Sequence, residues 1–322
     1  MSNGLSLKVV TIQYDAKFKK VDENIEYLTK LIDEKLESEK TVDVILLPEM
    51  CLTGYVFDNR EEIDFYCESP VLEYEGEEQR SENKYCRSIS FASQIAKKYD
   101  SYVVIGFPEK IHKKKDFNRH LAEKEKSSNY FPFEFNSEYR YYISAALISR
   151  KGNYIDHHRK HFITDYDKRW ANEGDYFKKF ELYSRENPFQ PIPTTIAICL
   201  DACSRNYDGK NDDDKMELGN FCYREGIQLI LFLCNWRIMD RSNTPNEEKI
   251  LNLINEWAER FGPLTDNKTE GVSYLITSNR VGKEKGNEFA GSSNIIQLKP
   301  SVKLFSNLEL YSSGALVETL KW

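Results

Sequence analysis

Residues 43–55 read DVILLPEMCLTGY, and this stretch decides the class of fold that we expect. Apart from its first residue, the run from Asp43 to Leu47 is entirely apolar, and Pro48 ends it. A continuous apolar run of this length is typical of a strand that is buried on both faces. Such strands lie in sheets that helices cover, so the stretch predicts a layered α/β protein.

Working outward from this strand, apolar strands and amphipathic helices alternate along the chain. Further strands are predicted at residues 9–14, 102–107, 141–148, 154–155, 195–200, 228–234 and 272–277, with several short strands from 294 onward. Helices are predicted at residues 22–36, 82–98, 216–224 and 247–260. In a fold of this kind, functional groups are expected where strands end and loops begin.

The composition sets limits on function. The 322 residues carry 45 Lys and Arg against 52 Asp and Glu, a net charge of −7, and 40% are hydrophobic. This balance suits a globular protein, and its acidic sign argues against nucleic-acid binding, which needs a basic face. No apolar run approaches the roughly 18 residues of a membrane span, and the first residues read as a strand rather than a leader. We therefore expect neither membrane insertion nor secretion.

The number of domains can be inferred from the absence of any boundary signal in the sequence. Its length alone would allow two domains of about 150 residues. However, we find no repeat, linker or composition shift, so we expect one domain over residues 1–322. Residues 110–140 interrupt the pattern as an insertion, which we interpret as a surface loop or as a lid over the site.

Seven cysteines lie at positions 51, 67, 86, 199, 203, 222 and 234. Their odd number and wide spacing oppose a secreted disulfide framework, so we expect free thiols in a reducing compartment, the cytoplasm and also the nucleus. Cys199 and Cys203 form a CxxxC pair without a second pair, which is a weak signal for zinc.

Three apolar strands each end in a reactive group. Glu49 follows the strand quoted above, Lys160 lies in HHRKHFI (residues 157–163), and Cys199 lies in TTIAICLD (residues 194–201). Together they supply what amide hydrolysis needs: a thiol nucleophile, a carboxylate base that takes its proton, and an ammonium that stabilises the oxyanion. The sequence thus predicts that Cys199 forms a thioester, which water activated by Glu49 then hydrolyses.

These three motifs, in this order, resemble the nitrilase or carbon-nitrogen hydrolase superfamily. The resemblance spans about residues 8–298 and implies a four-layer αββα sandwich, with Glu49 as base, Lys160 as oxyanion stabiliser and Cys199 as nucleophile. It implies no cofactor and no metal ion. It also makes a homodimer an expectation, because many relatives pair through exposed helices.

Within the superfamily, the sequence is similar to the fungal-type protein N-terminal amidases, which deamidate N-terminal Asn and Gln in the N-degron pathway. The likeness rests on ICLD (198–201), on residues 217–236, on EFAGSS (288–293) and on HFITDYDKRWANEG (161–174). It implies that the partners of this chain are protein or peptide N-termini bearing Asn or Gln, and that the products are Asp or Glu and ammonia.

Four residues are candidates for contact with the substrate: Glu173, Asp201, Asp167 and Trp236. A free α-amino group is often cationic because its pKa is about 7.7 to 8.0, so a carboxylate is expected beside it. The sequence does not choose among the three acids. Glu173 is also the nearest match to a second Glu that many superfamily members hold near the lysine.

Two rival functions remain open. An amidase or carbamoylase that acts on small free amides would use the same three groups. A thiol protease would instead pair Cys199 with a histidine, and His157, His158 and His161 all precede Cys199 in the chain. The HHRKHF segment is better explained by the lysine motif than by such a pair.

Overall fold

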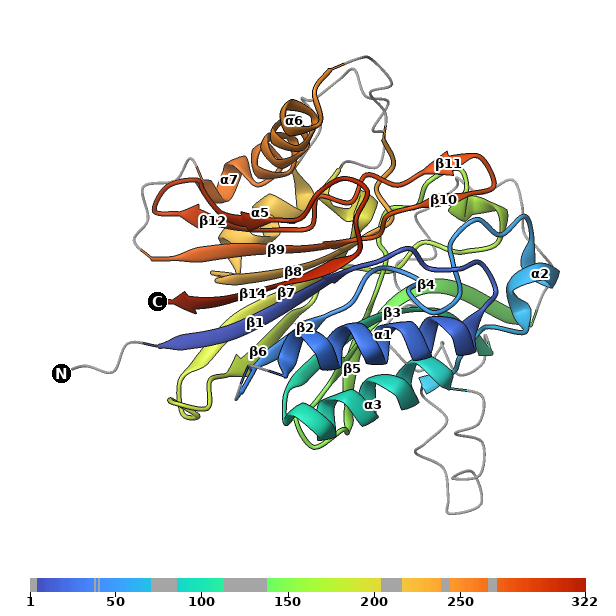
Figure 1. Ribbon diagram of the computed structural model, residues 1–322, viewed down its shortest axis with the longest axis horizontal. Helices are drawn as coiled ribbons and strands as arrows, with labels where there is room; N and C mark the ends of the chain where they lie inside the picture. Colours follow the sequence, from blue (N-terminus) through green and yellow to red (C-terminus); the bar gives the residue numbers. More distant parts are fainter. Residues whose placement is uncertain are drawn as a thin grey trace, which may run out of the picture.

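Two six-stranded β-sheets lie face to face, and helices cover their two outer faces (Figure 1). These four layers confirm the αββα sandwich that the resemblance implied. The computed structural model describes residues 5–37, 39, 41–70, 86–112, 138–203, 216–238, 244–265 and 271–322.

The first sheet has the strand order β14-β1-β2-β3-β4-β5. Its strands are β1 (Ser6–Gln13), β2 (Val44–Leu46), β3 (Tyr102–His112), β4 (Tyr139–Ile148), β5 (Tyr154–Arg159) and β14 (Gly314–Lys321). The central strands β1, β2 and β3 are parallel, whereas β4 and β5 each reverse direction. Because two reversals restore the original direction, β5 runs parallel to β2. The residues that follow β2 and β5 therefore lie at the same end of the sheet, beyond the carboxyl ends of both strands.

The second sheet has the strand order β13-β12-β9-β8-β7-β6. Its strands are β6 (Lys179–Tyr183), β7 (Pro191–Ile198), β8 (Leu229–Cys234), β9 (Ser273–Asn279), β12 (Asn294–Lys299) and β13 (Lys303–Asn307); β10 (Lys283–Glu284) and β11 (Asn287–Glu288) form a separate hairpin. Strands β7, β8 and β9 are parallel. The sequence missed β6, where buried Phe180 and Leu182 alternate with more exposed residues.

The helices form the two outer layers. Helices α1 (Val21–Leu36) and α3 (Arg87–Tyr99) pack on the first sheet, and α5 (Glu217–Arg224), α6 (Asn246–Glu259) and α7 (Gly262–Thr265) lie on the second, with the short α2 (Arg60–Asp64) beyond the strand ends (Figure 1). Helix α1 buries Leu28, Ile32 and Leu36, which recur every four residues on one face. All four predicted helices are found, although residues 82–85 of one lie outside the described residues.

The two sheets share an apolar core that polar contacts also cross. Inner-face residues such as Val9 and Val44 of the first sheet and Ile196 of the second belong to one buried cluster. Within it, Thr11 Oγ1 donates a 2.8 Å hydrogen bond to the carbonyl of Thr277 on β9. Buried hydroxyls that find such partners fix the position of one sheet relative to the other.

The predicted insertion begins and ends inside a hairpin. Strands β3 and β4 pair antiparallel from Val103 with Ile148 to His112 with Tyr139, so the first and last residues of the range 110–140 belong to strands. Residues 113–137 lie outside the described residues, and so does the choice between a loop and a lid.

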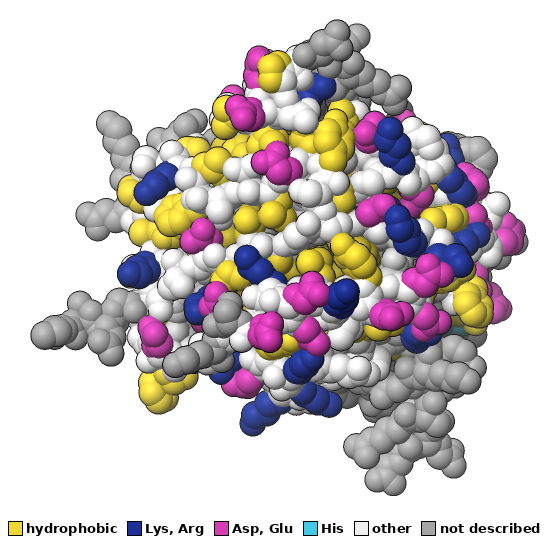
Figure 2. Space-filling view, in the orientation of Figure 1, with side chains coloured by type: hydrophobic (Ala, Val, Ile, Leu, Met, Phe, Trp, Pro, Cys, Tyr) yellow, Lys and Arg dark blue, Asp and Glu magenta, His cyan; other side chains and the backbone are white. Residues whose placement is uncertain are grey.

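Two surface features bear on the composition. On the face that Figure 2 shows, Lys and Arg side chains are interspersed with Asp and Glu, so neither charge forms a continuous patch there. Among the described helices, none combines the length and the apolar character that crossing a bilayer requires.

Candidate active site

The structure brings Glu49, Lys160 and Cys199 together at the ends of β2, β5 and β7. The Nζ atom of Lys160 donates a 2.8 Å hydrogen bond to Oε1 of Glu49, although 111 positions separate the two residues. The Cys199 thiol lies within electrostatic range of both. Glu49 and Lys160 are each 1% exposed and Cys199 is 6% exposed, so the group is almost fully shielded from water.

Asn235, the first residue after β8, holds the Glu49 carboxylate in the loop that follows β2. The backbone N–H of Asn235 donates a 2.8 Å hydrogen bond to Oε2 of Glu49, and the Asn235 side chain donates to the Glu49 carbonyl at 3.1 Å. Gly106 on β3 allows the close approach of this loop, because a Cβ atom there would lie 2.7 Å from the Glu49 Cα. Glu49 thus has little freedom to leave the position in which it meets Lys160.

Lys160 lies between two carboxylates. Besides Glu49, its Nζ donates to Oδ2 of Asp167 at 2.9 Å. The same Asp167 oxygen accepts the backbone N–H of Thr164 at 2.8 Å, which closes the loop that follows Lys160. The Tyr55 ring lies above the ammonium, with its centroid 5.7 Å from Nζ.

This arrangement sets the protonation states. Burial opposes the charge of Lys160, but Asp167 and Glu49 together outweigh it and raise the pKa of the ammonium well above its usual value. Burial raises the pKa of Glu49 to about 7, with Lys160 opposing and Asp167 assisting. Burial also raises the pKa of the Cys199 thiol well above its usual value, against the pull of Lys160. The resting thiol is therefore protonated and needs a base. Glu49 and Asp167 both act electrostatically on it, and Glu49 is the carboxylate whose pKa is raised to about 7, where it can take a proton.

The backbone at Cys199 differs from the prediction. The sequence predicted a strand over residues 195–200, but β7 ends at Ile198 and Cys199 begins a 3-10 turn, Cys199–Ala202, with φ of 46°. A non-glycine residue in this left-handed region costs roughly 1 to 3 kcal/mol, and such residues cluster at active sites. The turn breaks the strand and turns the nucleophile out of the sheet.

Asp201 has a different place from the one expected. The sequence offered it as a ligand for the substrate, yet its carboxylate is fully buried and already accepts four hydrogen bonds. The donors are His158 Nε2 at 2.7 Å and the backbone N–H groups of His161 (2.7 Å), Phe162 (3.1 Å) and Ile198 (2.8 Å). Asp201 thus ties both sides of Lys160 to the residue before Cys199, which is a positioning role.

Asp167, not Glu173, is the second carboxylate at Lys160. Asp167 lies on the 3-10 turn Asp167–Arg169, seven residues after Lys160, where the chain folds back on itself. Glu173 lies further along and is half-buried, and the backbone of its neighbour Gly174 donates to the Lys160 carbonyl at 2.8 Å. Asp167 is therefore the acid that contacts Lys160, and the match of Glu173 to a second family Glu stays a prediction.

Two buried oxygens at the site have no hydrogen-bond partner among the described residues: Oδ1 of Asp167 and Oδ1 of Asn235. Buried acceptors are nearly always paired, and an unpaired one costs about 1 to 3 kcal/mol. Each of these oxygens is therefore an acceptor that an N–H group of a bound molecule would satisfy. Asp167, one of the three predicted acids, thus keeps a buried carboxylate oxygen without a partner among the described residues.

Trp236, the fourth predicted substrate residue, follows directly after Asn235 and is 9% exposed. Its backbone N–H donates to Oδ1 of Asn279 at 2.9 Å. Its ring meets the Trp257 ring edge-on, with centroids 5.9 Å apart. The side chain is held firmly beside the site.

The three histidines of the rival protease have other partners. His158 binds Asp201, His161 Nδ1 lies 2.9 Å from the Gly174 carbonyl, and His157 Nε2 lies 3.3 Å from Glu109. The geometry therefore favours a carboxylate rather than an imidazole as the base for Cys199.

Asn235 is the functional residue that the sequence did not single out. It follows the all-apolar strand β8, LILFLC, as the first polar residue at a strand end. The same signal marks Glu49, so a polar residue after an all-apolar strand indicates both members of the hydrogen bond that Asn235 donates to Glu49.

Comparisons with known proteins agree with this site. The family model described as carbon-nitrogen hydrolase matches residues 8–306. The protein N-terminal amidase of Schizosaccharomyces pombe is 30% identical over 308 residues, which cover 91% of each chain.

Solved structures agree on the fold. A crystal structure of an N-terminal amidase with an Asn-Glu peptide has a TM-score of 0.72 at 20% identity, covering 99% of this chain and 98% of that one. A crystal structure of an N-terminal amidase with a Gln-Gly peptide has a TM-score of 0.71 at the same identity and coverage.

Proposed function

Because the chain belongs to the carbon-nitrogen hydrolase family, we propose that it deamidates N-terminal Asn and Gln of peptides or proteins. One observation carries the proposal: Lys160 bridges Glu49 and Asp167 beside the Cys199 thiol, and Asp167 keeps an unpaired oxygen there. The S. pombe relative, which covers 91% of this chain, carries the name of that activity.

In the first half-reaction, Glu49 takes the proton of the Cys199 thiol, and Sγ attacks the side-chain carboxamide carbon of Asn or Gln. The ammonium of Lys160 stabilises the oxyanion that forms, and a lost oxyanion donor typically costs about 2.7 to 4 kcal/mol of barrier. As the C–N bond breaks, Glu49 returns the proton to the leaving nitrogen, and ammonia departs.

In the second half-reaction, Glu49 takes a proton from water, which attacks the thioester. The C–S bond breaks, the thiol regains its proton, and a side-chain carboxylic acid remains. The sum is carboxamide plus water giving carboxylic acid plus ammonia. One carboxylate serves both halves because its raised pKa lets it hold or release a proton near neutral pH.

The unpaired Oδ1 of Asp167 supports selection for a free N-terminus. An α-ammonium group placed there would pair a buried carboxylate oxygen, whereas an acetylated nitrogen carries no charge and only one N–H. We extend the proposal to the N-degron pathway, which the resemblance implies, and to the cytoplasm and the nucleus, the reducing compartments that free thiols favour. Pairing of two copies stays a prediction.

Ammonia release from matched substrates tests the proposal. We expect turnover of peptides that begin with Asn or Gln and none of the same peptides after N-acetylation. Equal turnover of acetylated peptides, or faster turnover of small free amides, would instead support the rival amidase.

A further inference from the structure

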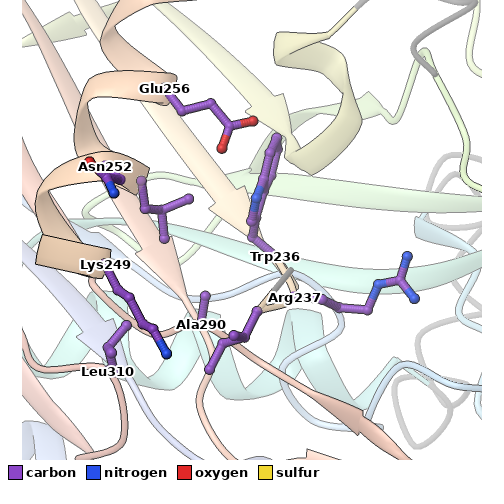
Figure 3. Close-up of a pocket in the computed structure, with 9 residues that line it drawn as sticks. Trp236, Arg237, Lys249, Asn252, Glu256, Ala290 and Leu310 are labelled. Atoms are coloured by element: carbon purple, nitrogen blue, oxygen red, sulfur yellow. The ribbon is translucent and has the colours of Figure 1, made fainter. Parts of the chain in front are cut away.

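A cavity of about 160 Å³ lies between helix α6 and the segment that follows β8. Figure 3 shows Lys249, Asn252 and Glu256 on the helix, with Trp236 across from them. The remaining lining residues are Arg237, Ile238, Leu253, Ala290 and Leu310. Cavities of about 150 Å³ take up a benzene ring, so this one has room for a single amino-acid side chain.

The cavity begins next to the catalytic groups. Trp236 forms its wall, and the preceding residue, Asn235, donates the backbone hydrogen bond that holds the Glu49 carboxylate. Strand β8 ends just before them, and ligands in α/β sheets bind beyond the carboxyl ends of strands.

The wall that helix α6 contributes also lies near the 3-10 turn Cys199–Ala202. Glu256 pairs with Arg260 at 2.6 Å, and the Arg260 guanidinium lies 5.7 Å from the Trp236 ring centroid. Burial raises the pKa of the Cys203 thiol to about 12, and the charges acting most strongly on it are those of Arg260 and Glu256. The wall therefore packs near the turn that begins at Cys199.

The next residue, Arg237, joins the cavity to the lysine loop. Its guanidinium lies 4.8 Å from the centroid of the Tyr166 ring, and Tyr166 precedes Asp167. It also donates to Oδ1 of Asn287 at 3.1 Å. The cavity is thus bounded by segments that lead to all three reactive groups.

The chemistry of the lining selects the occupant. Trp236, Leu253, Ala290 and Leu310 give an apolar surface, and Glu256 is already paired with Arg260. Lys249 adds positive charge at the rim, which disfavours a second cation. A medium-sized apolar side chain fits both the volume and the charge.

We propose that this cavity receives the side chain of the residue that follows the N-terminal Asn or Gln of the substrate. The inference rests on the proposed function, which concerns only the first residue of the substrate, and it adds a site for the second residue. The enzyme therefore reads two consecutive residues: the first at Cys199 and the second between Trp236 and helix α6. An apolar second residue is preferred over glycine, and lysine or arginine is disfavoured.

The test uses peptides that begin with Asn and differ only in the second residue, which is Gly, Leu or Lys. For the wild type we expect kcat/KM to be roughly 10-fold higher for Leu than for Gly, mainly through KM, and lowest for Lys. Asn252→Trp fills the rim from an exposed position and should reduce the ratio of Leu to Gly toward one. Lys249→Glu should raise kcat/KM for the Lys peptide.

Asn255→Trp is the matched control, since it makes the same change at an exposed position of α6 outside the lining. It should keep the wild-type ratio of Leu to Gly. Equal kcat/KM for Leu and Gly in the wild type, or equal effects of the two tryptophans, would overturn the inference. A wild-type protein that releases no ammonia from any of these peptides would overturn the proposed function itself.

Discussion

The Nζ atom of Lys160 lies 2.9 Å from Oδ2 of Asp167, a second carboxylate beside the one that Glu49 supplies. Asp167 and Glu49 raise the pKa of Lys160 and keep it charged, whereas burial, assisted by Asp167, raises the pKa of Glu49 to about 7. The site thus holds a charged ammonium and a carboxyl group that exchanges a proton near neutral pH, the two groups that the proposed mechanism needs.

Asp167→Asn tests this second carboxylate. Asp167 raises the pKa of Glu49, so its loss should shift the acid limb of the kcat/KM profile to lower pH. We also expect kcat to fall roughly 10² to 10³-fold, because the Lys160 ammonium is then held less firmly beside the oxyanion of the transition state. Steady-state ammonia release across pH measures both. An unchanged limb would mean that Asp167 does not act on Glu49.

The wild-type enzyme should lose activity on the acid side near neutrality. Glu49 must be ionised to take the thiol proton, and its pKa is raised to about 7 by burial. We therefore expect kcat/KM to rise with pH through about 7 and not near pH 4, the ordinary range of a Glu. A profile that is flat from pH 5 to 8 would contradict Glu49 as the base.

Cys199→Ala should abolish ammonia release, with a fall of at least about 10³-fold. The variant lacks the thiol at the first residue of the strained turn, where the thioester forms in the proposed mechanism. Cys203→Ala, four positions later and 2% exposed, serves as the control and should stay within a few-fold of the wild type. Circular dichroism of both variants checks that they fold. Equal loss in two folded proteins would show that the nucleophile is misassigned.

Lys160→Met should lower kcat more than it raises KM, by roughly 10² to 10³-fold, since the oxyanion charge exists only in the transition state. Lys168→Met removes an exposed lysine that pairs with Asp165, and it should behave like the wild type. Initial rates over a range of peptide concentrations separate the two parameters. A change in KM alone would remove the oxyanion role.

Glu68 links stability to pH outside the site. It is 3% exposed and accepts the backbone N–H groups of Ser88 and Ile89 at the start of α3. Burial raises its pKa to about 7, above the value in the unfolded chain. The folded protein then keeps a proton that the unfolded chain loses. The free energy of unfolding should therefore fall as pH rises from about 4.5 to about 7, by on the order of 3 kcal/mol from this group.

Glu68→Gln cannot titrate and should remove that part of the pH dependence, as urea unfolding at pH 5 and pH 8 would measure. Glu61→Gln, at an exposed position in α2, should leave it unchanged. The assignment fails if Glu68→Gln and the wild type lose the same free energy of unfolding between the two pH values.

The sequence by itself predicted the layers, most of the strands and the three strand-end groups. Buried strands such as β2 and β8 are apolar at every position, so the first polar residue that follows each of them stands out without any structure. Glu49 was found in this way, and the same pattern marks Asn235.

Only the tertiary structure decided which acid does what. Asp167, Glu173 and Asp201 look alike in the sequence, yet one pairs with Lys160, one lies half-buried further along, and one braces the turn at Cys199. Their partners depend on sheet pairing and on how the loops fold back, and Asn235 meets Glu49 across 186 positions. The local sequence pattern shows which residues are buried and whether they repeat with the period of a strand or a helix. The partner of a buried charge depends instead on which strand ends the two sheets bring together.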